Sequence, residues 1–151
     1  MNVYWKHFKV IMKHKYYVAQ ECFKRGLIWQ GIVHDLSKFS PTEFAESARY
    51  FQGNRSPIPV ARKLNGYSVA WLHHKAHNRH HWDYWVDFEG GQLVPCKIPE
   101  KYMKEMICDM LAASKSYATN RPIDYFEANV HKWIALPETI EYVRKGLKES
   151  L

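Results

Sequence analysis

The residues best suited to chemistry begin with the adjacent pair His34-Asp35. An imidazole beside a carboxylate suits a divalent metal such as Mn, Fe, Co, Ni or Zn, and a carboxylate-rich site would also admit Mg. Neighbouring residues on an α-helix point about 100° apart, so the two side chains can share an ion only where the helix ends. The polar stretch from Ser37 to Pro41 predicts a helix end at this pair.

Two further polar residues are predicted to face the interior of a helical protein. His14 and Asp109 each have apolar residues three positions before and four positions after them, which places both on apolar helix faces. A satisfied core histidine and a buried aspartate–lysine or aspartate–arginine pair are the ordinary explanations. A buried carboxylate, however, costs free energy unless it is paired or bound to a metal. One ion bound by His14, His34, Asp35 and Asp109 would satisfy all four groups.

A cluster of histidines occupies positions 73 to 81, where five of the nine histidines of the chain lie. If a helix continues through position 81, it brings His74, His77 and His81 to one face, or His73, His77 and His80, and the spacing favours neither set. The cluster could hold a second ion, contact a substrate phosphate or simply pack. The aromatic residues that follow it, Trp82, Tyr84 and Trp85, could stack on a base but are more typical of a core.

The elements that must position these residues are predicted to be helices. Apolar periodicity indicates helices over residues 3–24, 27–36, 41–51, 68–78, 100–118, 123–134 and 137–149. Ser40 and Glu43 form a capping-box signature, and we expect the Glu43 carboxylate to cap the third helix rather than bind metal. Residues 52–59 are predicted to form a loop, and residues 82–99 a loop or a short hairpin. The chain is therefore predicted to be a single all-α domain, a compact helical bundle over residues 1–151.

The bulk composition fits an intracellular protein. With 151 residues and 46% hydrophobic residues the chain can bury a core, and it has no apolar stretch that predicts a membrane span or a signal peptide. Its three cysteines form no CxxC pair and are predicted to be buried thiols. The net charge of +7 permits nucleic-acid binding, but the lysines and arginines are spread along the chain. We expect a cytoplasmic protein.

The order of the candidate ligands resembles that of the HD-domain superfamily, in which a His, a His-Asp pair and a distant Asp come from different helices. His14, His34-Asp35 and Asp109 match that order. The finer resemblance is to a family of small bacterial and phage proteins of unknown function. It is carried by HDLSKFSPTEF (34–44), His74 with NRHHWDYW (78–85), and EMICDMLA (105–112). The resemblance implies a helical bundle of the HD type that binds one or two divalent ions.

Most characterised HD proteins hydrolyse phosphate esters, so the resemblance implies a metal-dependent phosphohydrolase. The substrate would be a nucleotide or another small phosphate ester, and a metal-activated water would be the nucleophile. Asp35 would orient that water, and Lys38, Arg79 and His80 or His81 would neutralise the phosphate. HD nucleotidases of the 5′-deoxyribonucleotide type carry a glutamate where this chain has Lys38. The lysine instead resembles the HD-x-x-K pattern, in which it holds a phosphate. In HD proteins with two metals, extra histidines such as His74 and His81 would hold the second ion.

Three other functions are weighed against this one. A non-catalytic, metal-stabilised module that binds nucleic acid or a nucleotide would fit the positive charge. An HD-type oxygenase with two irons would fit the histidine-rich ligand set. A ββα-metal nuclease is disfavoured because its hairpin is not expected around His74 and Asn78. The substrate, the number of ions and the oligomeric state are open at this stage.

Overall fold

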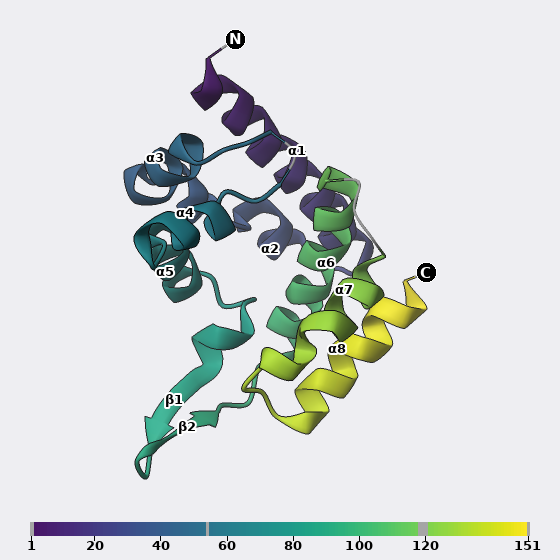
Figure 1. The fold of residues 1–151 in the computed structure, drawn as a ribbon. Coiled ribbons are helices and arrows are strands. Elements are labelled where there is room, and N and C mark those ends of the chain that lie inside the picture. Colours follow the sequence, from purple (N-terminus) through teal and green to yellow (C-terminus); the bar gives the residue numbers. More distant parts are fainter. Residues whose placement is uncertain (1, 54, 118–120, 151) are drawn as a thin grey trace.

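The computed structural model describes residues 2–53, 55–117 and 121–150, which form a mainly helical protein with one small hairpin (Figure 1). The all-α prediction is confirmed. In chain order the elements are α1 (Val3–Lys24), α2 (Ile28–Val33), the 3₁₀ turn η1 (Leu36–Phe39), α3 (Pro41–Arg49), α4 (Ile58–Asn65), α5 (Val69–His77), the 3₁₀ turn η2 (Trp82–Trp85), β1 (Val86–Glu89), β2 (Gln92–Pro95), α6 (Glu100–Tyr117), α7 (Pro122–Asn129), the 3₁₀ turn η3 (Val130–Lys132) and α8 (Pro137–Glu149). Among the described residues, no helix is both long and apolar enough to cross a membrane.

The centre of the fold is the contact between the two longest helices, α1 and α6 (Figure 1). Where they meet, the buried side chains are small, and they comprise Val18, Cys22, Cys108 and Ala112. Small residues let the two backbones approach closely, so polar groups on either helix are within reach of one another. Cys22 and Cys108 are free thiols, as expected, and both are buried, whereas Cys96 is only partly buried.

The largest apolar core lies on the other side of α6, against α7 and α8. Its fully buried members include Phe126, Val143 and Leu147. This core anchors α6 from behind, which leaves its opposite face free to present polar residues toward α1. The hairpin projects from the body of the molecule (Figure 1), and its strands pair in antiparallel register from Val86 opposite Pro95 to Glu89 opposite Gln92. Of the two possibilities predicted for residues 82–99, a loop or a short hairpin, the structure has the hairpin.

Helices α3, α4 and α5 form a second group, in which α3 contacts both α1 and α5. The residues buried on them include Ala48, Ala61 and Ala70, whose small side chains allow close packing. Helix α4 begins inside the segment 52–59, which was predicted to be a loop, so that prediction is wrong at positions 58 and 59. Its two prolines lie at its N-terminal end, where a missing N–H costs nothing, and Gly66 with φ of 82° ends it.

Several helices end earlier in the structure than the sequence predicted. Helix α2 ends at Val33 rather than position 36, α3 at Arg49 rather than 51, and α7 at Asn129 rather than 134. After α3 and α7 the apolar pattern continues into a segment that is partly buried, whereas after α2 it continues only to Leu36, which is exposed. The predicted C-terminal residue of the helix over 100–118 lies outside the described residues.

Gly31 fixes the distance between α2 and α1, and thereby the position of the His34-Asp35 pair. A Cβ atom at Gly31 would lie 3.1 Å from the Cβ of Cys22 and 2.8 Å from the ring of Phe23. We expect Gly31→Ala to lower the free energy of unfolding by about 1–2 kcal/mol, because overpacking outweighs the better helix propensity of alanine. Chemical denaturation would measure the change. Ile32→Ala, at an exposed position of the same helix, is the control, and equal stability of the two variants would contradict the prediction.

Candidate metal centre

The backbone turns sharply at the end of α2, and this turn presents two adjacent side chains to one centre. His34 leaves the helix in an extended conformation, with φ of −49° and ψ of 127°, and Asp35 adopts the left-handed conformation with φ of 53°. Asp35 is the one non-glycine residue with positive φ among the described residues. Aspartate tolerates this conformation better than most residues, and such outliers often occur at functional sites. The helix end predicted from the sequence is present here.

The first group of potential ligands comprises His14, His34, Asp35 and Asp109, all of which lie close together as predicted. The Nε2 atom of His14 is 2.9 Å from Asp109 Oδ1, which lies 3.6 Å from His34 Nε2. His34 Nε2 is in turn 3.2 Å from Asp35 Oδ2. Helices α1 and α6 and the end of α2 each contribute to this group. Three segments that are distant in sequence therefore supply its atoms.

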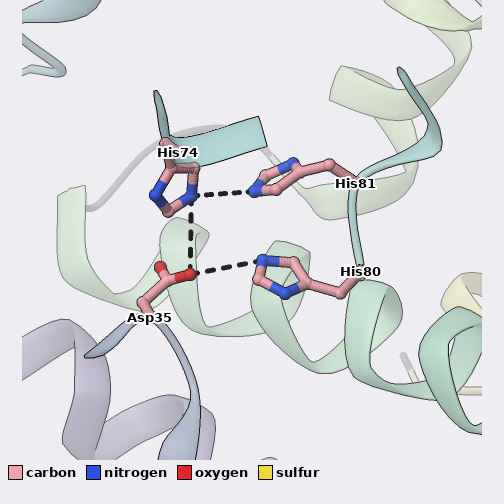
Figure 2. A group of neighbouring side chains, drawn as sticks. All are labelled: Asp35, His74, His80 and His81. Carbon is pink, nitrogen blue, oxygen red and sulfur yellow. Dashed lines mark hydrogen bonds and ion pairs between the residues drawn. The ribbon is translucent and has the colours of Figure 1, made fainter. Parts of the chain in front are cut away.

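The second group comprises Asp35, His74, His80 and His81 (Figure 2). The Nε2 atoms of His74 and His80 both lie 3.4 Å from Asp35 Oδ1. The Nε2 atoms of His74 and His81 are 2.9 Å apart. Figure 2 shows His74 and Asp35 on one side facing His81 and His80 on the other, with the carboxylate of Asp35 directed toward His74 and His80. Both His80 and His81 join His74, although the sequence had left the choice between them open.

Asp35 belongs to both groups and divides its two oxygens between them. Its Oδ2 atom faces His34, whereas its Oδ1 atom faces His74 and His80. The ligand atoms within each group lie within 4.8 Å of one another, which is about twice a typical metal–ligand bond of roughly 2.0–2.2 Å. Each group is thus close enough to hold one ion, and a carboxylate shared in this way would bridge two.

Several of the atoms in these groups have no hydrogen bond to any described residue, although they are buried. They include His34 Nε2, Asp35 Oδ1 and His80 Nε2. Buried polar atoms are normally satisfied, so three unsatisfied atoms pointing at one another need an explanation. A cation would satisfy all of them. The mixture of imidazole and carboxylate donors fits a first-row divalent metal, with Mg less suited to the histidine-rich second group.

Two glutamates contact the imidazoles on their Nδ1 side, away from the Nε2 atoms of the ligand groups. Glu105 Oε1 accepts a hydrogen bond from His34 Nδ1 at 2.9 Å and lies 3.3 Å from His80 Nδ1. Glu43 accepts one from His74 Nδ1 at 2.8 Å and another from His73 at 2.7 Å. Because an ionised carboxylate can only accept, each neutral ring facing it carries its proton on Nδ1 and leaves Nε2 free as a metal ligand. Carboxylate–histidine pairs of this kind are typical of metal sites.

Neither glutamate was predicted to support a ligand. Ser40 caps α3 as predicted, because its Oγ accepts the Glu43 N–H at 3.3 Å, but the Glu43 carboxylate contacts histidines instead of closing the capping box. Glu105 was not singled out. It lies one helical turn before Asp109 on α6, and that spacing was the available signal. His34, His80 and Glu105 are also close enough to form a third ligand group. Their contacts use Nδ1 atoms, which fits support of the other two groups.

The charges of the centre shift the pKa values of its residues strongly. Burial by itself would lower the pKa of His34, but the charge of Asp35 and hydrogen bonds with carboxylates raise it well above its ordinary value of 6.5. Burial would raise the pKa of Asp35, but the charges of His34 and Lys38 lower it well below its usual range. Burial also lowers the pKa of His81, which is therefore neutral. Carboxylates thus remain ionised here, and they attract a cation.

Helix α5 ends at His77, so the helical faces expected for positions 74 to 81 do not form. Asn78 is extended, and its Nδ2 atom donates to Ser37 Oγ and to the carbonyl oxygen of His74, both at 2.7 Å. This break returns His80 and His81 to the centre. His77 stacks on His73 instead, with ring centroids 3.9 Å apart.

Only some of the residues expected to contact a phosphate lie at the centre. Lys38 lies beside the centre, with its Nζ atom 2.6 Å from Asp35 Oδ2. Arg79 does not reach the centre, because it is exposed and donates to the hydroxyl of Tyr102 at 3.1 Å. His80 is buried within the second ligand group. Trp82 stacks on Trp133 against the core, with ring centroids 5.8 Å apart, as the packing alternative expected.

A cavity of about 200 Å³ lies against both ligand groups. Its wall includes His14 and Asp109 of the first group, His74 and His81 of the second group, and Lys38. A ligand in this cavity would contact both groups at once. The cavity is therefore suited to a small molecule that contacts the two candidate cation sites and Lys38.

The fold and the centre define a helical protein with two histidine–carboxylate groups that lie close enough to hold metal ions. The chain belongs to the family described as "Family of unknown function (DUF5662)", whose model matches residues 3–149. The match covers every residue of both ligand groups. Neither the comparison with curated proteins nor that with solved structures found a match.

Removal of metal is expected to destabilise the protein increasingly as the pH rises from about 7.5 to about 9. In the metal-free protein the proton on His34 offsets the carboxylates. Because the pKa of His34 is raised on folding, this stabilisation is present below pH 6.5 and is lost as the pH rises through the folded-state pKa. The histidines with lowered pKa are neutral in both states above about pH 7.5 and do not contribute. A bound ion replaces the proton, so its affinity rises over the same interval.

Thermal unfolding with and without EDTA would measure this effect. The decrease in melting temperature on adding EDTA should be a few degrees larger at about pH 9 than at about pH 7.5. The metal-free His34→Gln variant is the control, because its stability should not decline over the interval. An EDTA effect that is constant or shrinks with pH would contradict the prediction.

Glu105→Gln is expected to weaken metal binding about 10–100-fold without changing the number of ions bound, because it removes a hydrogen-bond partner of the ligands rather than a ligand. Competition with a chromophoric chelator would measure the affinity, and elemental analysis the stoichiometry. Glu100→Gln, an exposed position on the same helix, should leave both unchanged. Loss of one ion in Glu105→Gln would instead show that Glu105 is itself a ligand.

Proposed function

We propose that this protein is a metal-dependent phosphohydrolase of the HD type that acts on a small phosphate ester. The observation that carries the proposal is the position of Asp35. Its carboxylate is shared by two buried ligand groups, and both groups border one cavity that also contains Lys38. Such an arrangement favours a substrate whose anionic end can lie between two cations, and a phosphate has that geometry.

The ligand residues would hold one or two ions, one in the group of His14, His34, Asp35 and Asp109 and the other in the group of Asp35, His74, His80 and His81. When bound, such ions polarise a phosphoryl group and lower the pKa of a coordinated water. The histidine-rich second group favours Mn, Fe, Co, Ni or Zn over Mg for that position. The order of the ligands along the chain supports the resemblance to HD proteins.

The side chains of the protein would position the reactants. Lys38 stays charged, because the neighbouring Asp35 carboxylate raises its pKa, and its ammonium group can bind a phosphate oxygen. Asp35 stays ionised and can accept a hydrogen bond from a water, which would orient that water toward phosphorus. His80 is proposed as a ligand rather than as a contact to the phosphate, since it is buried against Asp35 and Glu105.

Phosphate release is the direct test. Protein purified without a histidine tag and loaded with Mn, Co, Ni or Mg should hydrolyse some members of a panel of nucleotides, sugar phosphates and phosphodiesters. Asp35→Asn should lower the rate more than about 100-fold, because even hydrogen-bond partners of metal ligands contribute about 10–100-fold. Asp87→Asn, exposed in the hairpin, is the matched control. Absence of product with every ester and every metal, in protein of verified metal content, would overturn the proposal.

The same preparations distinguish the two alternatives from other classes. A metal-stabilised module for nucleic acid would bind with an affinity that falls steeply with salt, and His34→Ala would lower its melting temperature with no turnover to lose. A di-iron oxygenase would purify with iron, show a di-iron absorption band and consume oxygen.

A further inference from the structure

His7 lies on the same face of α1 as His14, seven residues earlier. Seven residues are almost two full turns, so the two side chains point in nearly the same direction about 10 Å apart along the helix axis. His7 and His14 both border the cavity at the candidate metal centre. His7 therefore borders the cavity about two helical turns from His14. It belongs to neither ligand group.

The ring of His7 is buried but makes no hydrogen bond to any described residue. His7 is only 5% exposed, and neither of its ring nitrogens, Nδ1 and Nε2, has a hydrogen-bond partner among the described residues. The ring is held between Phe44 and Phe51, with centroid distances of 5.4 and 5.0 Å. A phenylalanine would pack as well against these rings at no polar cost. Buried polar atoms normally have a hydrogen-bond partner, and both nitrogens of this imidazole lack one. This favours a ligand as the missing partner.

The protonation state of His7 limits what that ligand can be. Burial and the nearby charge of Lys38 lower the pKa of His7 to about 4, so the ring is neutral at physiological pH. A neutral imidazole offers one N–H donor and one acceptor nitrogen. A hydroxyl group can use either of them, whereas a second anion would gain little. The same cavity wall also carries the neutral hydroxyls of Ser47, Ser56 and Tyr117.

The size of the cavity narrows the ligand further. Its volume of about 200 Å³ is below the roughly 300–1,000 Å³ typical of pockets for larger ligands. The wall carries the charged groups Lys38, Asp109 and Glu43 together with neutral polar side chains that include His7 and Ser47. A molecule with an anionic group and hydroxyl groups has partners of both kinds on this wall.

We infer that His7 is a specificity-determining residue that hydrogen-bonds a hydroxyl group of the substrate, and that the substrate class is a small, polyhydroxylated phosphate monoester. This inference rests on the proposed function for the phosphate end of the ligand. The phosphate lies against the ligand groups and Lys38, and the carbon chain extends along α1 toward His7. His7 neither binds metal nor takes part in the bond-breaking step.

Binding of a matched pair of probes tests the inference without relying on turnover. The probes are the phosphonate analogues of ribitol 5-phosphate and pentyl phosphate, which are not hydrolysed and differ only in their hydroxyl groups. Calorimetry with Mn²⁺-loaded protein should show about tenfold tighter binding of the ribitol analogue, in keeping with one or two neutral hydrogen bonds. His7→Phe should abolish this preference while the pentyl analogue binds as before. His7→Gln, which retains a donor and an acceptor, should preserve part of it.

The other outcomes separate the two proposals. Equal affinity of the wild-type protein for the two probes overturns the inference about His7 and leaves phosphate binding intact. An unchanged preference for the ribitol analogue in His7→Phe overturns the inference as well. If His7→Phe binds neither probe and has a lower melting temperature, the inference is also overturned, because His7 would then only support the fold. Failure of the wild-type protein to bind either probe overturns the inference together with the proposed function. His131→Phe, at an exposed position, controls for the substitution itself.

Discussion

Burial of the Asp35 carboxylate is the constraint on which the centre depends. A carboxylate removed from water requires compensating positive charge or hydrogen bonds, and in this protein it has histidines on both oxygens and a lysine beside it. The left-handed backbone at Asp35 brings the carboxylate into that position. The close contact at Gly31 holds α2 against α1. The helices around the centre can be understood as the means of delivering histidines to this one group.

Helices α1 and α6 provide the rigid frame for that delivery. Small residues at their contact bring them together, and the apolar core behind α6 keeps that helix from moving away. Along α1, His14 and His7 mark two depths of the same cavity. Along α6, Glu105 supports the imidazoles of His34 and His80, and Asp109, one turn further, faces His14. The regular spacing of these two long helices thus places His14, Asp109 and Glu105 at the candidate metal centre.

The second ligand group depends on an irregular segment instead. Because α5 stops at His77 and Asn78 bonds to Ser37 and to the preceding turn, His80 and His81 fold back beside His74. Glu43 on α3 then fixes the His74 ring from the other side. This half of the centre is therefore built from a different layer of the protein. Asp35 is the link between the two halves.

The sequence by itself determined the helical class and the four residues that meet in the first ligand group, and it left a loop or a short hairpin open for residues 82–99. These follow from local patterns: apolar periodicity, two polar residues on apolar faces, and a His-Asp pair before a helix stop. Tertiary structure alone decided which of the clustered histidines reach Asp35, because the helix break at Asn78 depends on a contact with Ser37, far away in the chain. It also decided the contacts that Glu43, Glu105 and His7 make. A polar residue in a helix has the same local pattern whether it supports a ligand, borders a cavity or faces water, and only its neighbours from other helices distinguish these cases.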